Sequence, residues 1–542
     1  MFFPSSFGTG VATVLTLLVV GTGAVAPLNR AWPLVSKVDH PLDAPLVDRN
    51  GTELPPLNTT YYFDQLIDHT NPSLGTFKQR YWHTWDYYES GGPIILLTPG
   101  EGNADGLLNH IGHTPALSLT EHITGYTGYL TNRTVNGMVA QELNGATIVI
   151  EHRYYGLSNP YNNLSVESLK YHTIEQAVND LEYFAYNVKL PMPGGDQVTP
   201  DDAPWILIGG SYAGALTAFT KVNKPDAFYA AWASSAVVES IVDFWDYFDV
   251  IRQHMPQNCS ADVQAVIAHI DSVFDSTNYT AIDEIKTMFN MNLTNLDDFA
   301  SALQNPMWDW QSLDVSPNLT DPRFYEFCDA LEVKDNETAP ESGWGLDHAL
   351  NTWADYWTTT YLPELCGDED IESCAGTYNP NSSLYTTIAV DNAARSWNWI
   401  VCNEMGFWQD GAPADVPTVV SRLIGPGYWE RQCMLMFPEA FSAPPTPSAN
   451  ETNQAYGGWF MQADRLFFAN GENDPWRGAT VSADGTNFQS TDMQPIAVGD
   501  GFHCSDLIIA NGEADSTVAA VQQQGLAAMK SWLEGWQAPS RR

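Results

Sequence analysis

The chain has 542 residues and a formal net charge of −42, because 65 Asp and Glu residues face only 23 Lys and Arg residues. Nucleic acid and anionic membranes repel such a polyanion, so we expect neither as a partner, whereas work in acid suits it because protonated carboxylates stop repelling one another. The length predicts two to four domains, or one large domain with an insertion.

The first 26 residues have the features of a signal peptide. An apolar stretch at 11–20 is followed by small residues that end in an Ala-x-Ala step at Ala24 and Ala26. The stretch is shorter than the ~20 residues that a membrane span needs, which disfavours a membrane anchor. We therefore predict a signal peptide at 1–26, an extended lead-in at 27–58, and a secreted, extracellular protein, with the vacuole or lysosome as second choice.

Ten Asn-x-Ser/Thr sequons support export, because a cytosolic chain is expected to contain fewer. A glycosylated asparagine lies at the surface, so each sequon also predicts an exposed position. The candidate glycosylation sites are Asn58, Asn132, Asn163, Asn258, Asn278, Asn292, Asn318, Asn336, Asn381 and Asn450.

Four continuous apolar runs in the first half predict strands that are buried on both faces of a parallel sheet. Between the second and third runs, residues 173–190 place apolar side chains at helical spacing, which completes a strand–helix–strand unit. The predicted strands are residues 93–98, 146–150, 205–208 and 230–233.

After the fourth strand the pattern changes to amphipathic helices that are rich in aromatic residues. We expect an α/β domain formed by 59–237 and 462–542, interrupted by a largely helical domain at 238–461. The helices predicted in the interruption are 240–255, 261–275, 281–303 and 346–361. The elements predicted after it are strands at 465–470 and 495–498 and a helix at 518–536.

Seven cysteines in an exported chain form at most three disulfides and leave one thiol over. We expect Cys366 to pair with Cys374 across a short loop, and Cys402 to pair with Cys433. The chain has no Cys-x-x-Cys pair, and its histidines lack the spacing of metal ligands, so we predict no metal and no cofactor.

The third predicted strand runs into Gly209-Gly210-Ser211-Tyr212-Ala213, which is similar to a nucleophile elbow. A strand that turns abruptly into a helix exposes the serine at its tip, and the helix N-terminus favours developing negative charge. Ala213 stands where the Gly-x-Ser-x-Gly pattern has glycine, and alanine is small enough to keep the turn. The alternative interpretation is an ordinary glycine turn after a strand.

The two later strands end in the other groups that a Ser-Asp-His triad needs. Asp474, which a proline follows, can accept a hydrogen bond from a histidine ring, with Asp464 and Glu472 as rival carboxylates. His503 can accept the serine proton and return it. The chain order Ser, Asp, His is that of α/β-hydrolases, and the three sites together are more specific than any one of them.

An oxyanion needs two backbone N–H donors. We expect one from Tyr212, directly after the serine, and the other from the glycine-rich loop after the first predicted strand, at Glu101 or Gly102. An ordinary glycine turn is the alternative interpretation of this loop.

At these residues the chain resembles the serine peptidase family of lysosomal Pro-X carboxypeptidase, dipeptidyl peptidase II and the acid prolyl endopeptidases of fungi. The resemblance covers most of the mature chain, and its most specific part is the sequence Glu-His-Arg-Tyr-Tyr-Gly at 151–156. The other segments are the Gly-Glu-Gly loop at 100–102, Gly209-Gly210-Ser211-Tyr212, Asn470-Gly471 with Asp474-Pro475-Trp476, Gly501-Phe502-His503 and the Trp-rich segment at 397–404.

The resemblance implies an α/β-hydrolase domain with a helical domain over the active site, and cleavage of peptide bonds after proline at acid pH. The chain departs from the family pattern twice, since Cys504 stands where a second histidine is common and Asn403 where threonine is. Both departures leave the specificity open. Because a histidine base must be neutral, we expect desolvation to keep part of His503 unprotonated in acid.

Proline is compact, apolar and rigid, so a pocket of aromatic and Met side chains suits it. We take Trp476, Trp399, Met405 and Phe407 as candidates for substrate binding, although each is nearly as well explained as a core residue. Glu404 could bind a charged substrate end or position a loop.

Two other functions use the same features. Esterases share the fold and the triad, and an inactive relative could serve as a binding protein, although such a relative would lack a triad residue. The sequence leaves carboxypeptidase, dipeptidyl aminopeptidase and endopeptidase action open. We expect proline-containing peptides or proteins as substrates, and a monomer or homodimer.

Overall fold

The computed structural model describes residues 35, 37–41, 45–105, 107–108, 122–318 and 320–538. The predicted signal peptide lies outside these residues.

An eight-stranded sheet organises the α/β part, with the strand order β13-β12-β9-β8-β4-β7-β3-β2. All neighbours from β7 to β13 pair in parallel, whereas β3 pairs antiparallel with both β7 and β2. This arrangement is an α/β-hydrolase fold, as predicted. The strands are β2 (Tyr61–Leu66), β3 (Thr76–Thr84), β4 (Ile94–Leu97), β7 (Ala146–Ile150), β8 (Trp205–Gly210), β9 (Ala230–Ser234), β12 (Leu466–Gly471) and β13 (Ile496–Gly499).

All six strands that the sequence predicts are confirmed. Five of them are continuous buried runs inside the sheet, and the sixth, β13, is an edge strand in which Val498 is exposed. The two antiparallel strands were not predicted. Several of their polar side chains are buried, including Gln65, Gln79 and Arg80. Such residues look like surface positions in a sequence and hide the strand.

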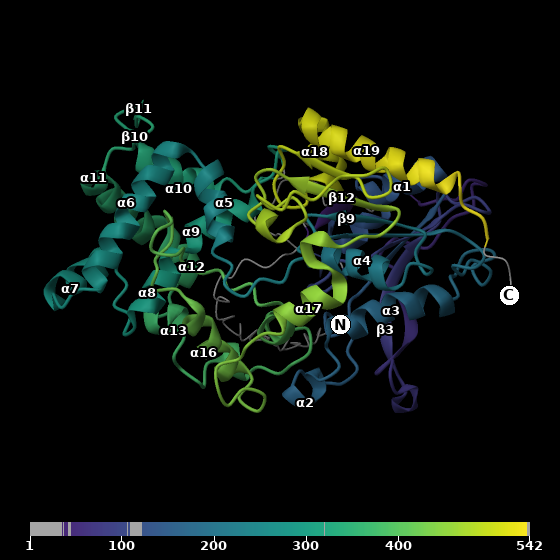
Figure 1. The fold of residues 1–542 in the computed structure, drawn as a ribbon, viewed down its shortest axis with the longest axis horizontal. Coiled ribbons are helices and arrows are strands. Elements are labelled where there is room, and N and C mark those ends of the chain that lie inside the picture. Colours follow the sequence, from purple (N-terminus) through teal and green to yellow (C-terminus); the bar gives the residue numbers. More distant parts are fainter. Residues whose placement is uncertain are drawn as a thin grey trace, which may run out of the picture.

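Helices cover both faces of the sheet (Figure 1). The side chains of β4 alternate between two apolar layers, with Ile94 and Leu96 in one and Ile95 and Leu97 in the other. The first layer is closed by α3 (Ile174–Asn187) and α4 (Tyr212–Asn223), and the second by α1 (Val135–Leu143) and α19 (Ser516–Leu533). The short α2 (Val166–Leu169) and α18 (Ile509–Ala514) lie in connections.

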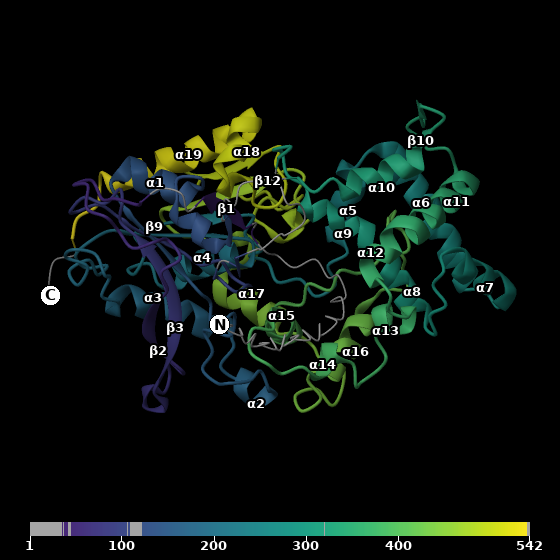
Figure 2. The same ribbon diagram turned by 180° about the vertical axis from the view of Figure 1, so that it is seen from behind.

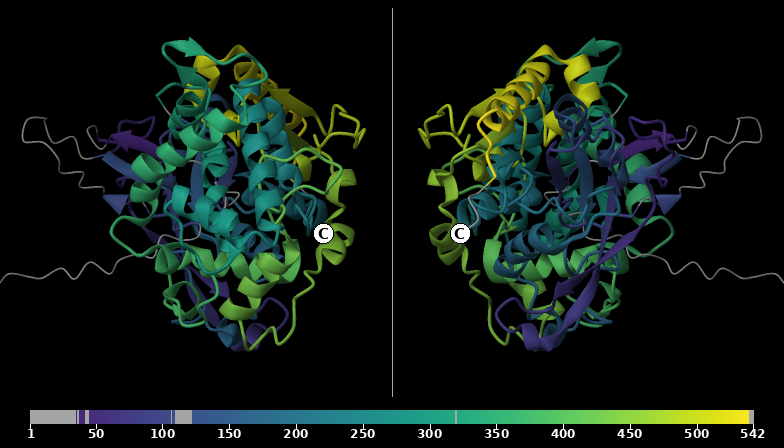
Figure 3. Two further views of the ribbon diagram at one scale, coloured as in Figure 1. Left: turned by 90° about the vertical axis from the view of Figure 1, so that its left-hand side faces the viewer. Right: turned by 90° about the vertical axis from the view of Figure 1, so that its right-hand side faces the viewer.

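Between β9 and β12 the chain forms a helical insertion, which lies beside the sheet on the side away from β2 and β3 (Figures 1 and 2). The left view of Figure 3 faces this insertion. Its longer helices are α5 (Asp246–His254), α6 (Gln257–Phe274), α7 (Tyr279–Met288), α8 (Leu296–Leu303), α10 (Arg323–Glu332), α11 (Leu346–Tyr356), α15 (Ala393–Ile400), α16 (Pro426–Met436) and α17 (Ala449–Tyr456). Short helices are α9 (Asn305–Trp308), α12 (Leu362–Cys366), α13 (Ile371–Ala375) and α14 (Ser383–Thr386).

The helix predicted at 281–303 is wrong as a single element. The helix α7 ends at Met288, Asn290 takes a left-handed backbone conformation with φ of 52°, and α8 begins only at Leu296. Asparagine tolerates this conformation better than most residues, so the chain breaks there although apolar residues continue on both sides. The helix predicted at 346–361 is confirmed, with a π-helical last part from Trp357 to Tyr361.

Three disulfides lie within the insertion. The predicted pairs Cys366–Cys374 and Cys402–Cys433 are confirmed, and a third joins Cys259 on α6 to Cys328 on α10. Sequence separation gave no signal for that third pair, because its cysteines are 69 residues apart. Cys504 keeps a buried thiol.

The ten sequon asparagines lie at the surface, which agrees with their predicted exposure. Asn163 and Asn258 are partly exposed, and the other eight are exposed. Within the described ranges, no helix has the length and apolar character to cross a membrane. Those ranges also hold no cluster of His, Cys, Asp and Glu that could bind a metal ion.

Candidate active site

Ser211 lies at the tip of a sharp turn between β8 and α4. Its φ of 64° is a left-handed value that a non-glycine residue rarely adopts, so the backbone is strained where the serine projects. The glycines before it are required by space: a Cβ on Gly209 would lie 2.3 Å from the carbonyl oxygen of Ala213, and one on Gly210 would lie 2.5 Å from Val35. This is the predicted elbow, with Ala213 accommodated at the fifth position.

The structure brings Ser211, His503 and Asp474 together in one chain of hydrogen bonds. The Ser211 Oγ lies 2.6 Å from His503 Nε2, and His503 Nδ1 lies 2.8 Å from Asp474 Oδ1. The rival carboxylates lie elsewhere, since Glu472 pairs with Arg477 and Asp464 is exposed. Strands β8, β12 and β13 run parallel, so their carboxyl ends meet at one edge of the sheet and deliver these three residues to the same place.

Asp474 is held in place by the turn that follows β12. Its Oδ1 accepts a hydrogen bond from the backbone N–H of Trp476 at 2.9 Å, in addition to the contact with His503. Both residues are buried, with Asp474 fully inaccessible and His503 8% exposed. The carboxylate therefore fixes the ring orientation and favours a proton on Nδ1, which leaves Nε2 as the acceptor that faces the serine.

Two opposing effects set the charge on His503. Burial is the largest single effect and lowers the pKa of His503, but the charge and hydrogen bond of Asp474 and those of Cys504 together raise it by more, so this pKa lies well above its usual range. The expectation that desolvation keeps the ring unprotonated in acid is therefore wrong in sign. The buried carboxylate at 2.8 Å and the neighbouring Cys504 together outweigh the loss of water around the ring.

The loop after β4, residues 98–105 (the β4 loop), lies against the start of α4. A Cβ on Gly100 would be 3.3 Å from the Cβ of Ala213 and 3.6 Å from its nitrogen, so only a glycine allows this close approach at φ of 80°. The Tyr212 N–H, in the first turn of α4, has no backbone acceptor within the described parts of the chain. The two predicted sources of oxyanion donors are therefore neighbours in the fold.

Glu101 has an unusual environment for an acid. Its side chain is fully buried, and neither carboxyl oxygen has a hydrogen-bond partner among the residues described. Burial raises the pKa of Glu101 well above its usual range, while the positive charge of His503 acts in the opposite direction. Glu101 is thus a neutral acid in the acid range. The sequence predicted a backbone role here and gave no signal for the buried side chain.

Two of the predicted substrate residues lie beside the triad. The Trp476 ring centroid is 6.3 Å from that of His503 and 5.3 Å from that of Phe407, and Phe244 and Tyr247 complete the aromatic cluster. Trp476 is only 1% exposed. The cluster therefore forms an apolar wall that Trp476 shares with the insertion.

The other predicted substrate residues occupy different surroundings. Met405 is buried and its Sδ accepts a hydrogen bond from Ser240. Trp399 packs on Phe437 and donates its indole N–H to the carbonyl of His172.

Glu404 is partly buried and accepts the backbone N–H of Ile174 at the start of α3, at 3.2 Å. Burial raises the pKa of Glu404 to about 8. Two roles were considered for Glu404, and its contact with the start of α3 fits the role of positioning a loop.

Cys504, which departs from the family pattern, packs under the elbow. It takes a left-handed conformation with φ of 57°, and its Sγ lies 3.8 Å from the carbonyl oxygen of Ser234. A Cβ on Gly210 would be 2.9 Å from this sulfur, so the thiol fills the space directly beneath the strand that carries Ser211.

The sequence resembles known proteins over nearly its whole length. The model of a family described as serine carboxypeptidase S28 matches residues 65–524, from β2 to α19. Serine protease vicPa of Bipolaris victoriae is 38% identical over 516 residues, which cover 91% of this chain and 92% of that protein.

Two further relatives are more distant. A probable extracellular serine carboxypeptidase of Arthroderma benhamiae is 30% identical over 79% of this chain and 59% of that protein. Lysosomal Pro-X carboxypeptidase of Homo sapiens is 24% identical over 94% of both.

Proposed function

Because this chain belongs to the serine carboxypeptidase S28 family of serine-type peptidases, we propose that it cleaves peptide bonds on the C-terminal side of proline at acid pH, with Ser211, His503 and Asp474 as its catalytic triad. The observation that carries the proposal is the hydrogen-bonded chain from Ser211 Oγ through His503 to Asp474. A nucleophile, a base and a residue that orients the base are the minimum that acyl transfer needs.

In this mechanism His503 Nε2 takes the proton from Ser211 Oγ as the oxygen attacks the carbonyl carbon of the scissile bond. The carbonyl oxygen becomes an oxyanion, which the N–H of Tyr212 and an N–H of the β4 loop at Glu101 or Gly102 stabilise. His503 then donates its proton to the leaving amine, which departs from an acyl-enzyme. A water molecule, activated by the same ring, attacks the ester and releases the acid.

The aromatic cluster beside His503 supports the preference for proline. A rigid, apolar ring suits the wall that Trp476 and Phe407 form and loses little conformational entropy on binding. Both side chains are 1% exposed, so binding of the ring must uncover part of this wall. The name of the human relative carries the same preference for that protein. Proline-containing peptides or proteins are thus the proposed substrates.

Export is the second part of the proposal. Three disulfides and ten exposed or partly exposed sequon asparagines support an oxidising, glycosylating route. We place the protein outside the cell, with the signal peptide at 1–26, and the relative from Arthroderma benhamiae carries an extracellular location in its name.

The test uses peptides that contain one internal proline, with both ends blocked, with only the amino end free, or with only the carboxyl end free. The purified protein is incubated with each at pH 4–5, beside Ser211→Ala, and the products are identified by mass. Cleavage after proline that is lost in the variant is the expected result, and the form that is cut distinguishes endopeptidase, dipeptidyl peptidase and carboxypeptidase action. Cleavage at other residues, or of simple esters only, would contradict the proposal.

A further inference from the structure

The sequence Glu-His-Arg-Tyr-Tyr-Gly follows β7 and contains none of the triad residues, yet it forms two buried ion pairs. Arg80 on β3 donates from Nε and Nη2 to the two oxygens of Glu151, at 2.9 and 2.6 Å. Arg153 donates in the same forked manner to Asp180 on α3. All four side chains are nearly inaccessible. Such pairs need a reason, because removing two charges from water is costly unless each is fully paired.

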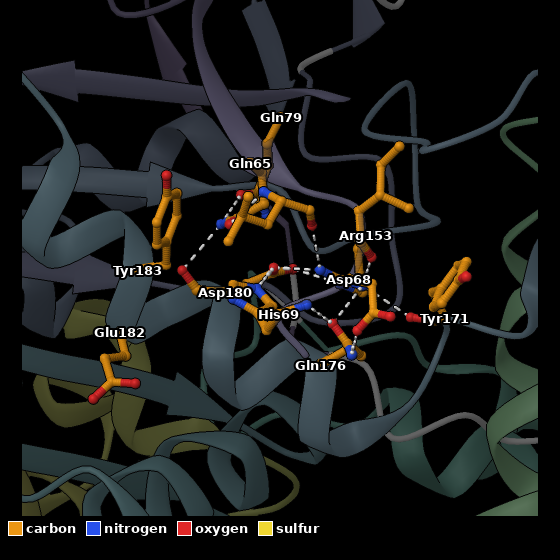
Figure 4. A network of polar contacts seen from close by, with 12 residues as sticks. Gln65, Asp68, His69, Gln79, Arg153, Tyr171, Gln176, Asp180, Glu182 and Tyr183 are labelled. Carbon is orange, nitrogen blue, oxygen red and sulfur yellow. Dashed lines mark hydrogen bonds and ion pairs between the residues drawn. The ribbon is translucent and has the colours of Figure 1, made fainter. Parts of the chain in front are cut away.

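The pair of Arg153 and Asp180 connects the end of β2 with α3 and the segment before it. Arg153 also donates to the carbonyl oxygens of Leu66 and Tyr171, and His69 contacts Asp180 (Figure 4). These partners lie at the end of β2, just after it, or shortly before α3, and none of them belongs to the β4 loop or to the triad. This pair therefore has a structural role that is independent of the triad.

The pair of Arg80 and Glu151 has different partners, because both residues contact the β4 loop. Glu151 accepts the backbone N–H of Ala104 at 3.0 Å. Arg80 donates from Nη2 to the side-chain oxygen of Asn103 at 2.8 Å, and from Nη1 to Asp105 at 3.1 Å. Three consecutive residues of the loop are thus fixed to the middle of β3 and to the residue that follows β7.

Ser158, just after the motif, and Gly156 within it complete the surroundings of this ion pair. Glu151 also accepts hydrogen bonds from the backbone N–H and the hydroxyl of Ser158. Gly156 approaches the pair so closely that a Cβ would lie 2.0 Å from Glu151 Oε1 and 2.7 Å from Arg80 Nη2. The last glycine of the motif is therefore explained by the space that the ion pair occupies, as well as by its φ of 52°.

We propose that Arg80 and Glu151 are positioning residues for catalysis, which hold the β4 loop against the start of α4 so that its N–H group meets the oxyanion. The proposal rests on the proposed function, since it assumes that Ser211 attacks a carbonyl whose oxygen turns toward this loop. Donors for an oxyanion act well only when they are fixed before the reaction, and a loop without a rigid support would not be.

Asn103 extends the same support to the helical insertion. Its amide donates to Asp391, at 2.9 Å, while its oxygen accepts from Arg80 and from the backbone N–H of Asp105. A change at Asn103 therefore loosens the β4 loop without leaving a buried charge unpaired, which makes it the mildest test of the proposal.

The test compares Arg80→Lys and Asn103→Ala with the matched control Asp180→Asn, which breaks the other buried pair of the motif. The measurements are kcat and KM for a proline peptide, the affinity for a peptide aldehyde that forms a tetrahedral adduct with a serine, and the affinity for the product peptide. Thermal unfolding of each variant shows that it is folded at the assay temperature.

We expect Arg80→Lys to lower kcat by about 100-fold, the size of the loss of one oxyanion donor. Asn103→Ala should lower kcat by about tenfold, because a partly misplaced group costs less than an absent one. In both variants the aldehyde should bind more weakly by the factor lost in kcat/KM, with product affinity unchanged. Asp180→Asn should lower Tm and leave kcat and aldehyde affinity as in the unaltered protein.

Unchanged kcat and aldehyde affinity in a folded Asn103→Ala and Arg80→Lys would overturn the proposal, and so would an equal loss in Asp180→Asn. If Arg80→Lys does not fold, Asn103→Ala alone decides. Full activity in Ser211→Ala would instead contradict the proposed function, so the two failures are distinguishable.

Discussion

At the scale of single residues, the charge on His503 decides how the proposed reaction depends on pH. Burial lowers the pKa of His503, and Asp474 together with Cys504 raises it by more, so the ring holds its proton to a higher pH than a free histidine. Only the unprotonated ring can take the serine proton. A peptidase that works in acid would therefore use a small unprotonated fraction of its base.

The protonation of His503 sets the direction in which kcat/KM changes with pH. We expect kcat/KM to rise tenfold for each pH unit on the acid side and to level off only above the usual pKa of histidine, near 6.5. Asp474→Asn should shift this limb to lower pH because it removes the charge, and should lower kcat by about 10⁴-fold because the ring loses its orientation. The measurement is kcat/KM between pH 4 and 8, and a profile that is flat over this range would contradict the account.

The hydrogen-bonded arrangement of Ser211, His503 and Asp474 was predictable because each of these residues follows a recognisable strand and the three types occur in a known order. The support of the β4 loop was not. Arg80 lies in an antiparallel strand among polar neighbours, and its partner Glu151 is 71 residues away. Only the folded chain brings a buried arginine and a buried glutamate together, so the motif at 151–156 was recognised as a pattern but its physical reason was hidden.

At the scale of elements, continuous apolar runs made the parallel strands predictable, whereas the helices of the insertion were found only in part. The helix α16 begins with Pro426 and Gly427, which are typical of loops, and it was not predicted. The predicted helix at 281–303 was interrupted by Asn290. Helical periodicity gives the presence of helices in such a region better than it gives their ends.

The start of α3 offers a test of Glu404, whose two proposed roles differ in what they predict. Glu404 accepts the N–H of Ile174, and because burial raises the pKa of Glu404 to about 8, it does so as a neutral acid at pH 5. Glu404→Gln keeps an acceptor and should leave both Tm and KM unchanged at that pH. Glu404→Ala should lower the free energy of unfolding by about 1 kcal/mol, as for other lost helix caps, with KM unchanged.

Chemical denaturation at pH 5 and peptide kinetics check this prediction. A KM that rises in Glu404→Gln while Tm stays constant would show instead that the carboxyl group binds the substrate.

At the scale of the whole molecule, buried acids make the folded state more stable at low pH than at neutral pH. Burial raises the pKa of Glu101 and of further carboxyl groups spread over the sheet and the insertion. The pKa is raised to about 6 for Asp246, Asp298, Asp309 and Asp506, and to about 8 for Glu332 and Glu404. In the unfolded chain these groups titrate near 3.8 and 4.5, so the folded protein holds more protons from about pH 4 to pH 8.

At these acids stability is lost as the pH rises through this window, since the unfolded state binds fewer protons there than the folded one. Burial lowers the pKa of His83 and His152 to about 4 and that of His172 well below its usual range, so these histidines act in the opposite direction up to about pH 6.5, but the acids outnumber them. Repulsion within a chain of net charge −42 acts in the same direction. We expect Tm to be highest near pH 4–5 and to fall steadily toward pH 8. Added salt should reduce the part due to surface charge and leave the part due to buried acids. A Tm that is constant or rises toward pH 8 would contradict this account.

The pH dependence of stability and that of the base have opposite signs. The fold is favoured by protons that the buried acids hold, and the reaction is favoured by the loss of one proton from His503. Activity in the acid range therefore combines a more stable fold with a small unprotonated fraction of the base.

The central claim is that Ser211 is the nucleophile of a proline-directed peptidase, and covalent labelling tests it most directly. A phosphonate ester that carries proline next to phosphorus is incubated with the protein at pH 5–6, and the labelled peptide is identified by mass after digestion. The account predicts one label, on Ser211, which is lost in His503→Ala and is slower for the probe with leucine in place of proline. Labelling of another residue, or labelling of Ser211 that His503→Ala leaves unchanged, would contradict it.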